Sequence, residues 1–168
     1  MSYEEVRYEG YAPSGIAVLV ECTTDNRNRT VSEVRHAFTK YGGSLGSEGS
    51  VAYLFDKVGL LIFPPGMDED VVMEVAVEAG AQDVETGPDG TVGVITEPEE
   101  LNFVTDQMSA AGLVSAVVEV VQRPTSETEL AGEEAEKVML LINALEDLDD
   151  VQDVFTNASF PEDMVFAS

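Results

Sequence analysis

The apolar positions in the first third of the chain follow the spacing of strands and then the spacing of a helix. Residues 5–8 and residues 16–23 have the length and composition of short strands, and together they predict a hairpin. Over residues 30–41 the apolar residues recur at helical spacing, so we expect one helix with a single buried stripe. The stripe consists of Val31, Val34, Phe38 and Tyr41. Residues 51–55 then return to the pattern of a strand.

Local signals predict where this first helix begins and ends. Residues 25–29, Asp-Asn-Arg-Asn-Arg, interrupt the preceding strand with turn-forming residues. Thr30 and Glu33 have the spacing of a capping box, in which each side chain bonds the backbone amide of the other residue. The glycines that open residues 42–49 end the helix, because glycine adopts the left-handed conformation at a helix C-terminus without steric cost. We therefore expect the helix to begin at Thr30.

The pattern restarts at residue 58 and gives the order β-α-β-β-α-β. The expected strands are residues 58–63, 82–86, 91–96 and 114–121. One helix is expected over residues 68–79, and a second follows a capping box at residues 96–99 and ends before Gly112. This order is that of the ferredoxin-like split βαβ motif. Right-handed crossovers then place both helices on one face of a four-stranded antiparallel sheet.

The first and last parts of the chain complement each other. Residues 16–55 supply β-α-β, and residues 133–156 supply a helix and a strand. Residues 124–132 and the tail from residue 157 have the composition of loops. Together these parts lack one strand of a second ferredoxin-like sheet, which the N-terminal hairpin strand fills or extends.

We therefore predict an α+β fold with two ferredoxin-like domains, one inserted into the other. Residues 1–56 and 124–168 form the discontinuous domain, and residues 57–123 form the inserted one. The alternative is two sequential domains. That arrangement leaves the helix and strand at residues 133–156 with a small core of their own.

The composition indicates a globular and strongly acidic protein. Hydrophobic residues make up 44% of the chain, which is typical of a folded domain. The net charge of −25 favours solubility and disfavours nonspecific binding to nucleic acid or to an anionic membrane. No apolar run approaches the roughly 20 residues of a membrane helix, and the N-terminus shows no secretory or transit segment. We expect a cytoplasmic protein, or a mitochondrial one for an organellar relative, with no membrane contact.

One segment of the chain is basic. Residues 26–41 carry a net charge of +3, so the rest of the chain carries −28. The candidate contact residues in this segment are Asn26, Arg27, Asn28, Arg29, Arg35, His36 and Lys40. The adjoining candidate contact loop contributes Gly42, Gly43, Ser44, Gly46 and Gly49. Cations and amides suit phosphate contacts, whereas the structural alternative is that the arginines pair with nearby carboxylates.

Four other candidate sites have weaker support. The glycine-rich loop, residues 42–49, is not expected to bind a nucleotide, because it lacks the Gly-Lys-Ser/Thr ending of a P-loop and precedes a strand. Cys22 is expected in the core and His36 on a polar helix face, so we expect no catalytic pair. Asp147, Asp149 and Asp150 lack the spacing of an EF-hand and are expected to form a solvated acidic turn. One cysteine and one histidine are too few for a zinc site, and we expect no metal and no cofactor.

Several stretches of the chain resemble the YebC family. The stretches are residues 8–11, 25–30, 34–38, 49–55, 78–81, 144–147 and 150–152. The resemblance covers nearly the whole chain and implies two α+β domains, one inserted in the other, which follow an N-terminal helical domain rich in lysine and arginine. This chain begins where the second domain of the family begins, so we expect a truncated form or a short relative.

The resemblance also implies a function. Members of the family are described as bacterial transcriptional regulators and mitochondrial translational activators, and are linked to the ribosome and to relief of stalling. It implies a non-enzymatic regulator of gene expression that acts at translation through ribosome or RNA contact. The alternatives are a DNA-binding transcriptional regulator, which the acidic charge disfavours, and a small-ligand-binding or sensor domain on a ferredoxin-like scaffold.

Overall fold

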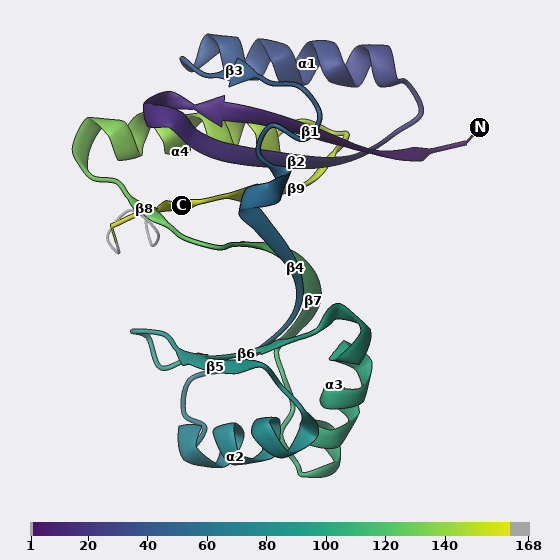
Figure 1. Ribbon diagram of the computed structural model, residues 1–168, viewed down its shortest axis with the longest axis vertical. Helices are drawn as coiled ribbons and strands as arrows, with labels where there is room; N and C mark the ends of the chain where they lie inside the picture. The colour runs from purple at the N-terminus through teal and green to yellow at the C-terminus, as the bar shows by residue number, and fades with distance from the viewer. Residues whose placement is uncertain (1, 162–168) are drawn as a thin grey trace. The chain divides into compact units, whose positions relative to one another are not determined.

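The computed structural model describes residues 2–161 and consists of two compact units (Figure 1). The first unit is discontinuous, because it comprises the chain up to Asp56 and the chain from Pro124 onward. The second unit comprises the intervening Lys57–Arg123. Within the described residues, no helix combines the length and the apolar character that crossing a membrane requires.

A four-stranded antiparallel sheet in the order β3-β1-β2-β9 forms the base of the first unit. The strands are β1 (Glu4–Ala12), β2 (Ile16–Thr24), β3 (Ser44–Leu45) and β9 (Val151–Thr156), and the helices are α1 (Arg27–Lys40) and α4 (Gly132–Glu146). A 3₁₀ turn at Pro13–Gly15 joins β1 to β2, with Ser14 and Gly15 at positive φ. In this order β1 takes the place that the third strand has in a ferredoxin-like sheet.

Both helices of the first unit pack against the same face of its sheet. Alternate residues of β2 point toward this face and meet apolar stripes of α1 and α4. The most buried members of this core are Val18, Val20, Cys22, Val34, Phe38, Val138, Leu141 and Leu145. Each large apolar side chain buried here stabilises the folded state by about 1.5–3 kcal/mol. Because β2 and α1 come from the first segment of the unit and α4 comes from the second, this core holds the two segments together.

The opposite face of the same sheet is only partly covered. Ala17 and Leu19 of β2 pack there against Val51 and Phe55. The remaining part of the face, which begins at Glu21 of β2, lines an open hollow. The first unit therefore has one fully covered and one half-open sheet face.

The second unit is a complete β-α-β-β-α-β module with the sheet order β5-β6-β4-β7. The strands are β4 (Phe55–Phe63), β5 (Asp83–Thr86), β6 (Val92–Thr96) and β7 (Val117–Pro124), and the helices are α2 (Glu69–Ala79) and α3 (Leu101–Ala110). Both helices lie on one side of the sheet (Figure 1) and share one core with it. The core includes Leu61, Phe63, Val72, Ala76, Val92, Val94, Leu101, Val104 and Met108. The predicted α+β class and the two ferredoxin-like sheets are confirmed.

Both predicted capping boxes are wrong. Helix α1 begins at Arg27, because the Asn26 side chain caps it by accepting the backbone N–H of Arg29 at 3.1 Å. Thr30 therefore lies inside the helix, where it is buried. At the second site no side chain caps the helix, and the Thr96 hydroxyl donates instead to the backbone carbonyl of Glu97 at 2.8 Å.

The strand predicted over residues 51–55 is also wrong. Ala52–Leu54 forms a 3₁₀ turn, and β4 begins at Phe55 and continues across the predicted domain boundary between residues 56 and 57. The physical reason is that the backbone N–H groups of Val51 and Ala52 donate to the buried carboxylate of Glu9. They are therefore not available for a strand ladder.

Two segments predicted to be loops contain paired strands. β8 (Thr128–Glu129) pairs in parallel with β10 (Ala158–Ser159). Leu130 and Ala158 are buried beside this pair in the core of the first unit. Both apolar residues were isolated in polar sequence, so periodicity gave no signal for them. The rest of the expected loose tail, from residue 162, lies outside the described residues.

Replacement of Leu141 by Ala in α4 is expected to destabilise the first unit by about 2–5 kcal/mol, because Leu141 is fully buried. The adjacent Leu140 is 53% exposed, so Leu140→Ala is the matched control and should change the stability by less than about 0.5 kcal/mol. All five tyrosines lie in the first unit, so tyrosine fluorescence during urea unfolding reports on this unit alone. Equal effects of the two substitutions would contradict the assigned helix face.

Candidate functional site

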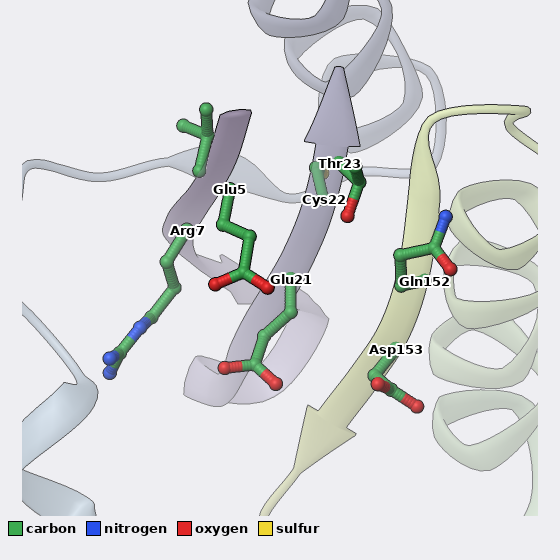
Figure 2. Close-up of a pocket in the computed structure, with 8 residues that line it drawn as sticks. Glu5, Arg7, Glu21, Cys22, Thr23, Gln152 and Asp153 are labelled. Atoms are coloured by element: carbon green, nitrogen blue, oxygen red, sulfur yellow. The ribbon is translucent and has the colours of Figure 1, made fainter. Parts of the chain in front are cut away.

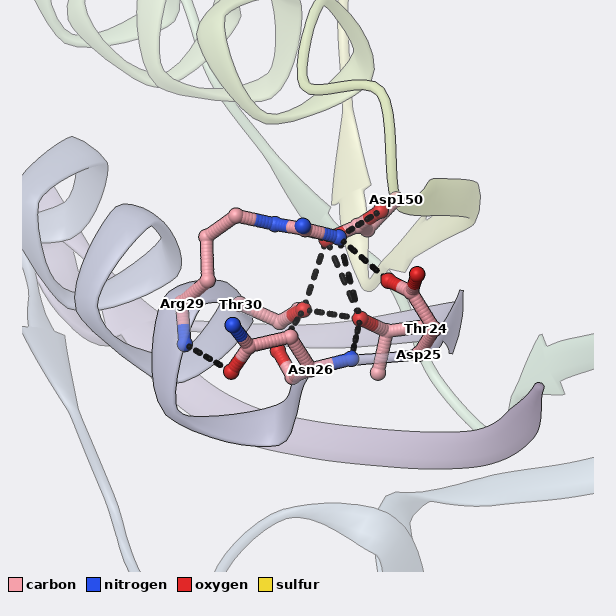
Figure 3. A network of polar contacts seen from close by, with 6 residues as sticks. All are labelled: Thr24, Asp25, Asn26, Arg29, Thr30 and Asp150. Carbon is pink, nitrogen blue, oxygen red and sulfur yellow. Dashed lines mark hydrogen bonds and ion pairs between the residues drawn. The ribbon is translucent and has the colours of Figure 1, made fainter. Parts of the chain in front are cut away.

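A buried polar cluster joins the first turn of α1 to the end of β2 and to the residue before β9 (Figure 3). The Asp150 carboxylate lies at its centre and is 8% exposed. The Thr30 and Thr24 hydroxyls donate to this carboxylate at 2.7 Å and 3.2 Å. The Arg29 guanidinium donates to both of its oxygens, at 2.9 Å and 3.1 Å, and also to Asp25 at 3.0 Å. Such charge-assisted bonds are among the stronger hydrogen bonds in proteins.

The cluster lowers the pKa of Asp150. The hydrogen bond from Thr30 is the largest cause, and Arg29 adds to it, while burial opposes the shift. The same bonds raise the pKa of Arg29. Asp150 is therefore an ionised structural anchor, and the prediction that it belongs to a solvated acidic turn is wrong.

Two of the candidate contact residues belong to this local structure. Asn26 caps α1 with its side-chain oxygen, and Arg29 pairs with Asp150. Arg27 forms an ion pair with Glu4 at 3.3 Å, but both side chains are more than half exposed. An exposed pair of this kind contributes at most about 1 kcal/mol, so Arg27 is able to exchange its partner.

The remaining candidates of the helix lie together on the side of α1 that points away from the core. Six side chains at helical spacing are exposed there, and none of them is acidic. We call them the α1 outer face: Asn28, Ser32, Arg35, His36, Thr39 and Lys40. Within the described part of the chain, no carboxylate lies within ion-pair distance of Arg35, His36 or Lys40. Lys40 also lies over the ring of Tyr41, with its Nζ 5.5 Å from the ring centre.

A shallow hollow adjoins the C-terminal end of the α1 outer face. Its volume is ≈ 390 Å³, and its lining includes Lys40 and Tyr41 from the end of α1 together with Lys137 and Leu140 from α4. Leu140 is 53% exposed. Lys137 was not among the residues expected from the sequence, because it lies almost 100 positions from Lys40 and no local pattern connects them.

The glycine-rich loop has a mainly structural role. Gly42 has φ +83°, which suits the helix end. Gly43 packs against the backbone carbonyl of Tyr11 so closely that a Cβ atom has no room. Ser44 pairs with Tyr11 in the sheet, and the Gly46 N–H donates to the backbone carbonyl of Glu9 at 2.8 Å. These four loop candidates are thus positioned by backbone geometry.

Glu9 anchors the far end of this loop. Its carboxylate is 5% exposed and accepts the backbone N–H groups of Gly49, Val51 and Ala52 at 2.7, 3.0 and 2.7 Å. Burial by itself would raise the pKa of Glu9, but the three N–H donors outweigh it and lower the pKa. This role of Glu9 was not predicted, because a glutamate in a strand beside polar residues is expected to face solvent.

A second group of hollows lies along β1. One hollow of ≈ 350 Å³ covers the open part of the sheet face, and Figure 2 shows the side chains of Glu5, Arg7, Glu21 and Asp153 around it. Cys22 also lines this hollow, but its side chain is buried, and burial raises the pKa of its thiol to about 11. Since the thiol stays protonated at neutral pH, it is a poor nucleophile.

The chain is similar to a group of bacterial proteins over nearly its whole length. The family model described as the TACO1/YebC second and third domain matches residues 3–158. A probable transcriptional regulatory protein of Francisella tularensis is 54% identical over 162 residues, which are 96% of this chain and 65% of that protein. A protein of the same description from Nitrosococcus oceani is 52% identical over 165 residues, which are 98% of this chain and 66% of that protein.

A solved structure agrees with the fold. The crystal structure of a conserved hypothetical protein, Aq1575, from Aquifex aeolicus matches with a TM-score of 0.86 and 48% sequence identity. The match covers 95% of this chain and 66% of that one. The chain thus spans just under two thirds of the length of the relatives that it matches.

Replacement of Asp150 by Asn is expected to destabilise the first unit by about 2 kcal/mol at pH 7, because it removes charge-assisted hydrogen bonds from Arg29 and Thr30. The lowered pKa of Asp150 fixes the pH dependence. The stabilisation of the folded state by the ionised Asp150 carboxylate is fully present above the unfolded pKa of about 3.9, and it is lost as the pH falls through the folded pKa.

Urea unfolding of the wild type and of Asp150→Asn between pH 7 and pH 3 measures this difference. Asp149→Asn is the matched control, because Asp149 is exposed. The stability difference between wild type and Asp150→Asn should shrink below about pH 4. A difference that stays constant over this range would contradict the anchoring role of the ionised carboxylate.

Proposed function

The chain belongs to the TACO1/YebC family, and from this membership we propose that it is a non-enzymatic regulator of gene expression that acts at translation. In this proposal it contacts RNA, either free or in the ribosome, through the α1 outer face. The relatives are named as probable transcriptional regulatory proteins, which supports a role in gene expression.

The observation that carries the proposal is the absence of carboxylates from the α1 outer face in a protein with 33 acidic residues. Arg35 supplies a guanidinium that binds phosphate oxygens in a bidentate manner, and Lys40 supplies a point charge. The amide and hydroxyl side chains of the face are further hydrogen-bond donors to phosphate and sugar oxygens. Together these groups make a surface that suits a nucleic-acid backbone.

Two neighbouring features extend this surface. Lys137 lines the same hollow as Lys40, so a cation of α4 adds to those of α1. Arg27 at the other end of the helix is bound only by an exposed ion pair with Glu4. Asn26 and Arg29 serve mainly to hold the helix start, so we assign them a positioning role.

The acidic remainder of the chain favours RNA within the ribosome over isolated duplex DNA. A net charge of −25 repels a free polyanion, and a small basic face gives only a few phosphate contacts against it. Ribosomes present basic proteins beside RNA, so the acidic and the basic surfaces of the chain both find complementary partners there. DNA binding is the second candidate, favoured by the names of the relatives.

Replacement of Arg35, His36 and Lys40 together by Ala is expected to weaken co-sedimentation with purified ribosomes at least tenfold at low salt. Removal of two cations should also reduce the slope of log K against log salt concentration by about 2. The matched control is the double variant Lys57→Ala with Arg123→Ala, which removes two cations from the second unit. It should bind as the wild type does.

The same variants are then tested with single-stranded RNA and with duplex DNA of the same sequence. Tighter binding to duplex DNA than to RNA or ribosomes would favour the transcriptional function instead. Equal ribosome binding by the triple variant and the wild type would place the contact elsewhere and overturn the proposal for the α1 outer face.

A further inference from the structure

The outer edge of β1 is only partly paired. β3 contacts β1 at Gly10 and Tyr11, and the last hydrogen bond between the two segments runs from the Gly46 N–H to the Glu9 carbonyl. Beyond this point, no strand of the described chain pairs with the outer side of residues 5–8. The edge of the sheet therefore continues for several residues after its neighbour has turned away.

The backbone groups of Glu5 and Arg7 point toward this unpaired side. Glu5 lies directly opposite Thr23 of β2, and the Thr23 N–H donates to the Asp150 carbonyl on the far side of β2. The N–H and C=O groups of every second residue of β2, counted from Thr23, therefore point toward β9. The β1 residues directly opposite them form non-hydrogen-bonded pairs with β2. Since Glu9 has the same phase and its carbonyl accepts Gly46, the N–H and C=O groups of Glu5 and Arg7 face outward.

Space for an added chain lies along this edge. Two adjoining hollows of ≈ 380 and ≈ 400 Å³ are lined by Arg7 of β1, by Arg27 of α1 and by Glu48 of the glycine-rich loop. Gly46 packs against Ser50, where an added Cβ would lie 2.7 Å from the Ser50 hydroxyl. The loop thus folds onto itself, and Glu48 borders the hollows beside residues 5–8.

The charges beside this edge favour a basic occupant. Arg7, Glu21 and Asp153 lie in one row across the sheet, and Glu5 occupies the next exposed position of β1. Figure 2 shows the side chains of Glu5, Glu21 and Asp153 around the hollow on this face, whereas Arg7 extends away from Glu5 and Glu21. Of the charged side chains that line the two hollows, Glu5, Glu9 and Glu48 are acidic and Arg7 and Arg27 are basic, and Arg27 is already paired with Glu4. This excess of carboxylates attracts lysine or arginine side chains at alternate positions of an added strand.

We propose that the β1 edge between Glu5 and Arg7 binds an extended, basic polypeptide segment as an additional strand of the sheet. Main-chain hydrogen bonds to the outward N–H and C=O groups give this mode its affinity, and the carboxylates select the basic side chains. A nucleic acid lacks the alternating amide pattern and is repelled by the same carboxylates. A second copy of the chain also carries a net charge of −25 and is therefore repelled from this edge. This surface adjoins the N-terminal end of the α1 outer face, because Asn28 lines one of the two hollows, but the proposal does not depend on the function proposed above.

Binding of the capped peptide Lys-Val-Lys-Val-Lys-Val-Lys to the wild type and to two variants at Arg7 tests the proposal by calorimetry. Arg7→Pro removes the outward N–H but no hydrogen bond to β2, so the hairpin should remain folded. Arg7→Ala is the matched control, which keeps the N–H and loses only the cation. We expect Arg7→Pro to bind about tenfold more weakly or worse, and Arg7→Ala to bind at least as tightly as the wild type.

Amide hydrogen exchange of the wild type gives a second readout that requires no substitution. The peptide should protect the N–H groups of Glu5 and Arg7, which face outward, and should change those of Val6 and Tyr8 much less. The corresponding peptide with glutamate in place of lysine should not bind.

Results of three kinds would overturn the proposal. The first is equal peptide binding by Arg7→Pro and Arg7→Ala, or no protection at Glu5 and Arg7. The second is equal binding of the acidic peptide. The third is protection of these amides that rises with protein concentration in the absence of peptide, which would assign the edge to a second copy of the chain. None of these measurements involves RNA or ribosomes, so their failure is separate from any failure of the proposed function.

Discussion

The first unit depends on one ionised carboxylate, that of Asp150, to hold three of its segments together. It lies just before β9 and binds side chains from the end of β2 and the first turn of α1, which are more than 100 residues earlier in the chain. Its backbone carbonyl also accepts the Thr23 N–H. One residue thus fixes the register at the edge of the sheet, the start of a helix and the junction of two distant segments. A buried carboxylate has this effect only when its hydrogen-bonding capacity is filled, as it is here.

The positive charges of the first unit have different tasks. Arg29 is used to neutralise Asp150 within the fold, whereas Arg35 and Lys40 have no carboxylate partner in the described structure. The same sorting applies to the acidic residues. Glu9 is enclosed by backbone N–H groups, while Glu5 and Glu21 remain beside an open hollow. The net charge of the chain therefore says little about any one surface, and local arrangement decides which partner each surface suits.

The sequence predicted the fold class because apolar periodicity is a local signal. Val34 and Phe38 of the predicted helical stripe, for example, are fully buried. The site was predicted less well, because the sign of a charge does not tell whether its partner is solvent or a distant side chain. Arg29 finds its carboxylate 121 residues away. Glu9 shows the same difficulty, since a strand glutamate gives no sign that a later loop will bring it three N–H groups.

The insertion of the second unit between the two segments of the first has a consequence for the order of folding during synthesis. The second unit has all of its strands and helices once residue 124 has been made, and its contacts are contained within one continuous segment. The first unit lacks α4, β9 and Asp150 at that time, so the part of the apolar face of its β1–β2 hairpin that α4 covers in the folded protein is still exposed to solvent. Domains made at a few residues per second fold as they are completed. The enclosed unit therefore folds before the unit that encloses it, although the β1–β2 hairpin is made earlier.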